Sequence, residues 1–162
     1  RSTLFPYTTL FRSRLMILGE GELRADLEQL AERLGVAADL AMPGFLPNPY
    51  ALMSRAAVFV QSSRWEGLPS VLVEAMACGT PVVATDCPGG TREILDDGKL
   101  GALVPLDDDQ ALADSIARTL DDPVPANAMA YKVGQFTLDR AVDTYLDLAL
   151  GTGRARSWEH GR

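Results

Sequence analysis

Glu66 and Glu74 are the residues whose type and spacing best suit chemistry in this chain of 162 residues. Glu66 falls in a loop and Glu74 in the helix expected after it, so both lie beside a helix N-terminus. Such a terminus offers unpaired N–H groups and the positive end of the helix dipole, which together can hold a phosphate. Carboxylates there would repel the phosphate unless they faced neutral groups such as sugar hydroxyls. The pair therefore suits a nucleotide-sugar site, and the alternative is two solvated glutamates at a helix start.

The segment that follows Glu66 predicts a helix and then a buried strand. Pro69 and Ser70 mark the helix start, since proline suits the first turn and serine suits a cap. Gly79 can take the left-handed conformation that ends a helix, and the run 82–85 is typical of a strand covered on both faces. Apolar residues at helical spacing predict one buried helix face, which comprises Leu68, Val71, Leu72, Ala75 and Met76.

Short apolar runs alternate with amphipathic segments along the rest of the chain. This order predicts an α/β fold, a Rossmann-like parallel sheet with helices on both faces. In such a sheet, ligands bind at the carboxyl ends of the strands. The expected strands are 15–18, 40–43, 58–61, 82–85 and 101–104, and the expected helices include 22–34, 50–56, 91–95, 126–133 and 137–150.

Two further patterns are weaker candidates for sites. Gly19 and Gly21 follow the first strand, but Arg24 holds the position of a third glycine, and a lone G-x-G is a weak dinucleotide signal. Asp107, Asp108 and Asp109 could suggest a metal cluster. They precede the apolar stripe of a helix, so helix capping explains them better, and we expect no metal site.

Composition excludes several classes of function. The formal net charge is −7, and no basic cluster accompanies the few aromatic residues, which argues against nucleic-acid binding. No apolar run is long enough to cross a bilayer. Cys78 and Cys87 fit neither a disulfide framework nor a zinc motif, which favours the cytoplasm. The single histidine, His160, lies in a polar tail, so we expect no histidine-dependent catalysis.

The two ends of the chain differ from its middle. Residues 1–13 contain no acidic residue, and residues 3–13 resemble the translation of a sequencing adapter. We expect residues 1–13 to be an artefact, with a genuine N-terminal strand as the alternative. Residues 14–150 should form one domain without its native front part, and residues 151–162 a polar tail.

The stretch from Ser62 to Leu95 carries a resemblance to a known family. It reads S-S-R-W-E-G-L-P-S-V-L-V-E-A-M-A-C-G-T-P-V-V-A-T-D-C-P-G-G-T-R-E-I-L. This sequence resembles the E-x7-E signature of retaining GT-B glycosyltransferases of family 4 (group 1 type). The likeness extends, nearly without gaps, from about Leu15 to Asp122. A bare E-x7-E would be a weak signal, but its long context makes it specific.

The resemblance implies that residues 14–150 are a nucleotide-sugar (donor) binding domain, the C-terminal half of a GT-B fold, truncated at its N-terminal side. That half normally has one more strand and helix before the Leu15 strand, and this strand is central in the order 3-2-1-4-5-6. Its loss should separate the Leu15 and Leu40 strands from the other three. We therefore expect the chain to be poorly stable alone, unless the adapter-like residues fill the gap that the strand leaves.

The resemblance also implies roles for particular residues. Glu66 would contact the transferred sugar and act as the catalytic residue, without needing to be the nucleophile. Glu74 would accept hydrogen bonds from ribose hydroxyls. The remaining donor-binding residues would lie beside the sugar, diphosphate or base: Gly67, Leu68, Pro69 and Ser70 in the Glu66 loop, Gly19 and Gly21 in the donor cleft, and Phe45 and Leu46 against the nucleobase. For Phe45, a place in the core remains an alternative.

The implied activity is a retaining hexosyl transfer from a nucleotide-diphosphate sugar to an acceptor hydroxyl in glycan, lipopolysaccharide or exopolysaccharide synthesis. A UDP-hexose or UDP-N-acetylhexosamine is the expected donor, with GDP-sugars open and no cofactor required. The acceptor glycan or lipid-linked sugar would bind a missing N-terminal domain, so this chain alone should be inactive. The location implied is cytoplasmic, at the inner membrane face if that domain binds membrane. A GT-B epimerase and a non-catalytic nucleotide-binding module are the alternatives.

Overall fold

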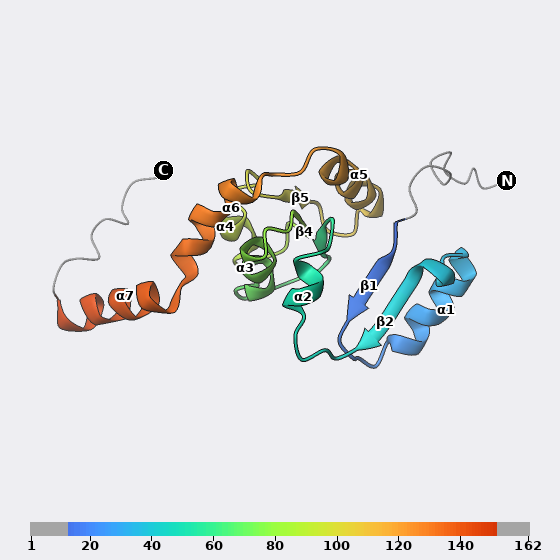
Figure 1. The fold of residues 1–162 in the computed structure, drawn as a ribbon, viewed down its shortest axis with the longest axis horizontal. Coiled ribbons are helices and arrows are strands. Elements are labelled where there is room, and N and C mark those ends of the chain that lie inside the picture. Colours follow the sequence, from blue (N-terminus) through green and yellow to red (C-terminus); the bar gives the residue numbers. More distant parts are fainter. Residues whose placement is uncertain (1–12, 152–162) are drawn as a thin grey trace. The chain divides into compact units, whose positions relative to one another are not determined.

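The computed structural model describes residues 13–151, which fall into a first unit up to residue 49 and a second unit from residue 50. The first unit contains β1 (Leu15–Leu18), α1 (Arg24–Leu34), the short 3-10 helix η1 (Ala37–Asp39) and β2 (Leu40–Gly44) (Figure 1). β1 and β2 pair in parallel, with Leu15 opposite Leu40. The helix α1 ends as predicted at Gly35, which adopts a φ of +72°.

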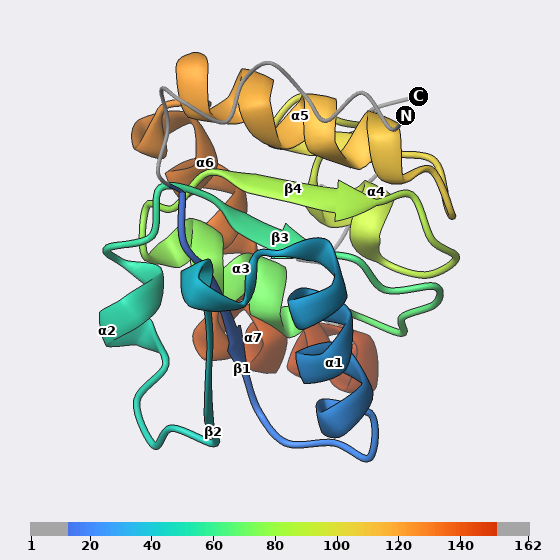
Figure 2. The same ribbon diagram turned by 90° about the vertical axis from the view of Figure 1, so that its right-hand side faces the viewer.

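The second unit is a parallel sheet covered on both faces. Its strands β3 (Phe59–Gln61), β4 (Val82–Thr85) and β5 (Ala102–Val104) lie side by side in that order, with β4 in the middle. The helix α3 (Ser70–Ala77) packs against β3 and β4, and α5 (Asp109–Asp121) packs against β4 and β5. Figure 2 shows α3 and α5 on opposite faces of these strands, as the strand–helix alternation predicts.

Further helices complete the second unit. They are α2 (Tyr50–Met53), α4 (Thr91–Ile94), α6 (Ala126–Val133), the 3-10 helix η2 (Gly134–Phe136) and α7 (Leu138–Leu150). No residue of α7 is buried. Its exposed apolar side chains include Leu138, Tyr145, Leu148 and Leu150.

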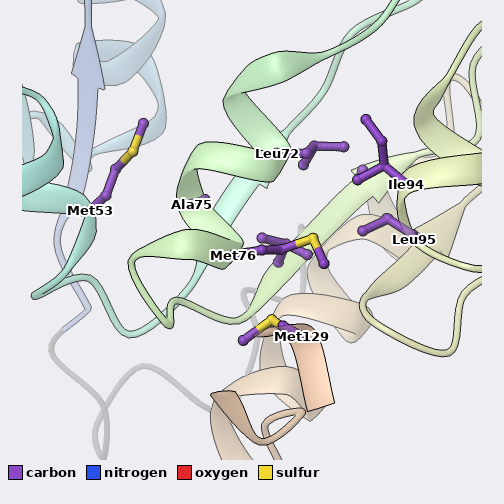
Figure 3. Close-up of a cluster of buried hydrophobic side chains, with 9 residues drawn as sticks. Met53, Leu72, Ala75, Met76, Ile94, Leu95 and Met129 are labelled. Carbon is purple, nitrogen blue, oxygen red and sulfur yellow. The ribbon is translucent and has the colours of Figure 1, made fainter. Parts of the chain in front are cut away.

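The core of the second unit surrounds α3. Figure 3 shows a cluster of buried side chains that α2, α3, α4 and α6 contribute, among them Met53, Leu72, Met76 and Met129. All four residues of β4 are buried, which confirms that this strand is covered on both faces. Because parallel strands need both faces covered, the apolar run 82–85 could be placed from the sequence alone.

The strands of the two units form separate sheets, β1-β2 and β3-β4-β5. This finding confirms the predicted separation of the Leu15 and Leu40 strands from the other three. Within residues 13–151, no helix is both long and apolar enough to cross a membrane.

Two details of the expected α3 are wrong. Leu68, assigned to the buried face, is 58% exposed because it precedes the helix and does not share its periodicity. Ser70 does not cap the helix: Pro69 holds the N-cap position, and no side chain caps it with a hydrogen bond. Proline at the cap still fits, since it lacks the N–H that a helix start leaves unpaired.

Helix capping is confirmed for the aspartates before α5. The Asp108 side chain accepts a hydrogen bond from the Ala111 amide at 2.9 Å. In the part of the chain that the structure describes, no group of three or more His, Cys, Asp or Glu residues could hold a metal ion.

Candidate functional site

Glu66 lies in the loop that joins the carboxyl end of β3 to the start of α3. Its carboxylate oxygen Oε1 accepts two hydrogen bonds, from Gln61 Nε2 at 2.8 Å and from Ser63 Oγ at 2.7 Å. The other oxygen, Oε2, takes part in none of the hydrogen bonds formed among residues 13–151. The half-buried carboxylate is thus held at one oxygen and left available at the other.

The neighbouring strand supports the same loop. Thr85, the last residue of β4, donates its hydroxyl to the backbone oxygen of Ser63. Ser63 in turn donates to Glu66, so the position of the carboxylate depends on both β3 and β4. Carboxyl ends of parallel strands meet at one edge of a sheet, which is where this fold class binds ligands.

A second loop, residues 86–90, packs directly against the Glu66 loop. The Glu66 amide donates to the Pro88 carbonyl at 3.1 Å, and the Gly90 amide donates to the Gly67 carbonyl at 2.7 Å. Gly89 adopts a φ of +119°, and a Cβ there would lie 1.9 Å from the Glu66 carbonyl oxygen. Only glycine allows this approach without a shift of the backbone.

Glu74 lies on α3, in the turn after the helix start. It is half-buried, and its carboxylate makes no hydrogen bond among the described residues. At the helix start, the Ser70 amide donates to the Leu68 carbonyl at 2.8 Å and the Leu72 amide to the Pro69 carbonyl at 3.0 Å. These two amides already have partners, so a phosphate would have to use other donors.

The two arginines near the loop are paired with aspartates. Arg64 donates to Asp107 at 2.8 Å, and both side chains are exposed. Arg92 binds Asp86 and Asp97. The hydrogen bond to Asp86, followed by that to Asp97, raises the pKa of the Arg92 guanidinium above its ordinary value. Both arginines therefore serve local ion pairs in this structure.

A hollow of about 190 Å³ opens at this edge of the three-stranded sheet. Ser62, Arg64, Thr85, Asp107 and Leu112 are among the residues that line it. A larger hollow of about 410 Å³ lies between the end of α3 and α6, and no predicted site residue lines it. The hollow at the strand ends is the one that shares residues with the Glu66 loop.

In the first unit, the predicted residues follow the ends of β1 and β2. Gly19 lies directly after β1, and its amide donates to the Gly44 carbonyl at the end of β2, at 2.9 Å. Gly21 follows two residues later and has open space at its α-carbon. Phe45 is 78% exposed, so the alternative that places it in the core is wrong, and Leu46 beside it is half-buried.

Arg24, which replaces the third glycine of a dinucleotide motif, forms hydrogen bonds within the first unit. Its guanidinium binds Glu20 at 2.9 Å, Glu28 at 3.0 Å and the Met42 carbonyl. The hydrogen bond to Glu20 raises the pKa of Arg24 above its ordinary value, with Glu28 adding to it. Arg24 therefore connects the start of α1 with β2.

Sequence reasoning selected Glu66 but missed the side chains that hold it. Gln61 is a polar residue at the end of an apolar strand, and Ser63 lies three residues before Glu66. A polar residue in a strand expected to be buried was the available signal, because such a residue needs a hydrogen-bond partner.

Comparison with known proteins gives the family. The family model described as "Glycosyl transferases group 1" matches residues 10–135. The chain belongs to this family. The chain is also 36% identical over 109 residues to a 4-alpha-N-acetylgalactosaminyltransferase of Campylobacter jejuni that acts on a diphospho-undecaprenol glycan, covering 67% of this chain and 30% of that protein. It is 34% identical over 139 residues to the lipopolysaccharide core biosynthesis glycosyltransferase LpsE of Rhizobium meliloti, covering 83% of this chain and 41% of LpsE.

Solved structures agree with the fold. The Anabaena protein HepE, solved in complex with UDP-glucose, superposes with a TM-score of 0.75 at 27% identity, covering 86% of this chain and 41% of HepE. The chain thus has the parallel α/β architecture of part of a GT-B glycosyltransferase. It spans from about 20% to 41% of the length of the first curated relatives.

Proposed function

We propose that this group 1 glycosyltransferase chain is the donor-binding domain of a retaining enzyme that transfers a hexose or N-acetylhexosamine from a UDP-sugar. The acceptor would be a hydroxyl of a polysaccharide or lipid-linked glycan. The observation that carries the proposal is the Glu66 carboxylate at the carboxyl edge of the sheet, which is held at Oε1 and has no hydrogen bond at Oε2 among the described residues. A fixed carboxylate with a free oxygen suits recognition of a sugar hydroxyl.

The donor and pathway rest on the relatives. HepE binds UDP-glucose, and the relatives from C. jejuni and R. meliloti serve, by their names, glycan and lipopolysaccharide synthesis. We carry both properties to this chain as part of the proposal. The enzyme would then work in the cytoplasm, where UDP-sugars are made, and its acceptor would bind a further domain of the full-length protein.

In the proposed reaction, the bond from the anomeric carbon to the UDP oxygen breaks, and the acceptor oxygen bonds to that carbon on the same face. The acceptor's proton passes to the leaving phosphate. Glu66 accepts a hydrogen bond from the sugar and keeps it in place, with the Gly67–Ser70 backbone alongside. Glu74 accepts hydrogen bonds from the ribose.

Negative charge grows on the diphosphate as the bond breaks and needs a cation or hydrogen-bond donors. Arg64 and Arg92 are engaged by aspartates. The resemblance to retaining GT-B enzymes implies that an Arg and a Lys ahead of the Leu15 strand take this role, and we include them in the proposal. In the first unit, Gly19, Gly21, Phe45 and Leu46 would contribute the base and diphosphate contacts.

The test is calorimetric titration of UDP, GDP, UDP-glucose and UDP-N-acetylglucosamine into the full-length protein. We expect UDP to bind, and Glu74→Ala to weaken it about tenfold or more, because each lost hydrogen bond to a charged group costs about 1.5–3 kcal/mol. Glu32→Ala, an exposed glutamate on α1, is the control and should change nothing. If the folded protein binds no nucleotide, the transferase proposal fails. If it binds a UDP-sugar but does not transfer the sugar, the chain is a non-catalytic nucleotide-binding module and not part of a transferase.

A further inference from the structure

Gln61 is a buried polar residue whose place in the structure needs an explanation. It ends β3, only 6% of its surface is exposed, and its Oε1 has no hydrogen-bond partner among the described residues. A buried acceptor without a donor is unfavourable, and native proteins keep few such groups without a functional reason. An apolar side chain at position 61 would remove that penalty.

The hydrogen bond to Glu66 explains why the amide is oriented this way. Gln61 Nε2 donates to Glu66 Oε1 at 2.8 Å. Turning the amide over would place two acceptors, Gln61 Oε1 and the carboxylate oxygen, against each other. The amide therefore serves the carboxylate and leaves its own oxygen unpaired.

Ser63 completes the arrangement. Its hydroxyl donates to the same carboxylate oxygen at 2.7 Å, and its backbone oxygen accepts from Thr85. Two donors on Oε1 limit rotation of the carboxylate and leave Oε2 as the oxygen for a ligand. Preorganisation of this kind reduces the ordering cost that binding would otherwise carry.

We infer that Gln61 is a positioning residue, which, with Ser63, holds Glu66 Oε1 so that Oε2 can accept a hydrogen bond from the sugar of the donor. The inference rests on the proposed function and concerns the sugar part of the donor alone. Gln61 would then raise the affinity for UDP-sugar relative to UDP, because UDP lacks the sugar that Glu66 would bind.

The experiment compares dissociation constants of UDP-glucose, UDP-N-acetylglucosamine and UDP for the full-length protein and for Gln61→Met. Methionine keeps the length of the side chain but donates no hydrogen bond. We expect the preferred UDP-sugar to bind about three- to tenfold more weakly while UDP affinity stays the same, because the hydrogen bond from the sugar to Glu66 remains and only the fixed position of the carboxylate is lost. Ser63→Ala should act in the same direction, and Ser63→Thr, which keeps the hydroxyl, should restore most of the preference.

Two controls separate positioning from a general structural effect. Gln110→Met removes a similar amide-to-carboxylate bond, to Asp114 at 2.9 Å, between two exposed side chains of α5, and should leave all affinities unchanged. In a Glu66→Ala background, Gln61→Met should add no further loss, since the group that it positions is gone.

Each outcome decides the question. An unchanged preference in both Gln61→Met and Ser63→Ala, with the Glu66→Ala preference lost, overturns the positioning role and leaves the proposed function standing. Equal weakening of UDP and UDP-sugar overturns it in favour of a structural role. A wild-type protein that binds neither ligand removes the proposed function and this inference together.

Discussion

At the scale of single residues, the shape of the Glu66 loop depends on a glycine that carries no chemistry of its own. Gly89 lies so close to the Glu66 backbone that a Cβ would come within 1.9 Å of its carbonyl oxygen. Its φ of +119° is also a conformation that side chains rarely adopt. Steric contact and backbone strain therefore act together at this position.

We predict that Gly89→Ala lowers the free energy of unfolding by about 2–4 kcal/mol, since overpacking and backbone strain each cost on the order of 1–3 kcal/mol. Urea denaturation followed by circular dichroism measures the change. Gly134→Ala is the matched control, because its φ is −58° and nothing lies within 4 Å of an added Cβ. Equal midpoints for the two variants would show that the 86–90 loop yields more easily than the structure indicates.

Sequence and structure agree unevenly at this scale. Glu66 and Glu74 could be selected from the sequence because their E-x7-E spacing and the residues around them form a local sequence motif. The support from Thr85 and Gly89 could not, since it depends on how two loops meet at the sheet edge. For Gln61, the sequence offered only an unexplained polar residue.

At the scale of elements, the three aspartates before and at the start of α5 have different roles. Asp108 accepts from the Ala111 amide, and Asp107 pairs with Arg64. Asp109 is the first helical residue, where a negative charge meets the positive end of the helix dipole. The cluster thus begins the helix, and one member ties it to the Glu66 loop.

We predict that Asp108→Ala destabilises the second unit by about 1 kcal/mol, the usual cost of a lost N-cap. Asp107→Ala should cost less, because its ion pair is exposed and such pairs contribute about 0–1 kcal/mol. Urea midpoints of the two variants, measured side by side, test the order. A larger effect for Asp107→Ala would mean that the Arg64 pair matters more than the cap.

Most elements could be predicted from periodicity, and the errors fall at their ends. The bounds of β1, β4 and α6 agree with the sequence prediction, because each follows an uninterrupted apolar or amphipathic pattern. Leu68 and Ser70 were misassigned because the first residues of a helix obey cap geometry, which its periodic pattern does not describe. Thr137 shows the same limit: the expected helix 137–150 includes it, but it holds the N-cap position before α7, where its side chain forms no cap hydrogen bond.

At the scale of the whole molecule, the two units differ in how much they bury. In the first unit, Ala31 is the sole buried apolar side chain among residues 13–49, whereas the second unit has the cluster around α3. Leucines of α1 stay well exposed, including Leu23 at its N-cap and Leu34 at its end. A unit with little buried apolar area opens at low free energy.

We predict that amides of β1, α1 and β2 exchange with solvent at least tenfold faster than amides of β4 in this chain. Hydrogen exchange read by mass spectrometry measures both in one experiment. Adding UDP to the full-length protein should slow exchange in both units if the donor binds residues of each. Equal protection of the two units in the isolated chain would refute the predicted difference in stability.

The supports of Glu66 also share a short stretch of sequence. Residues 61–90 contain all of these supports: the side chains of Gln61, Ser63 and Thr85, and the backbone of Pro88, Gly89 and Gly90. Recombination between group 1 genes could therefore transfer this stretch as one unit. A crossover outside residues 61–90 would transfer Glu66 together with the residues that hold it. A crossover inside this stretch would combine the Glu66 loop of one parent with the supporting residues of the other.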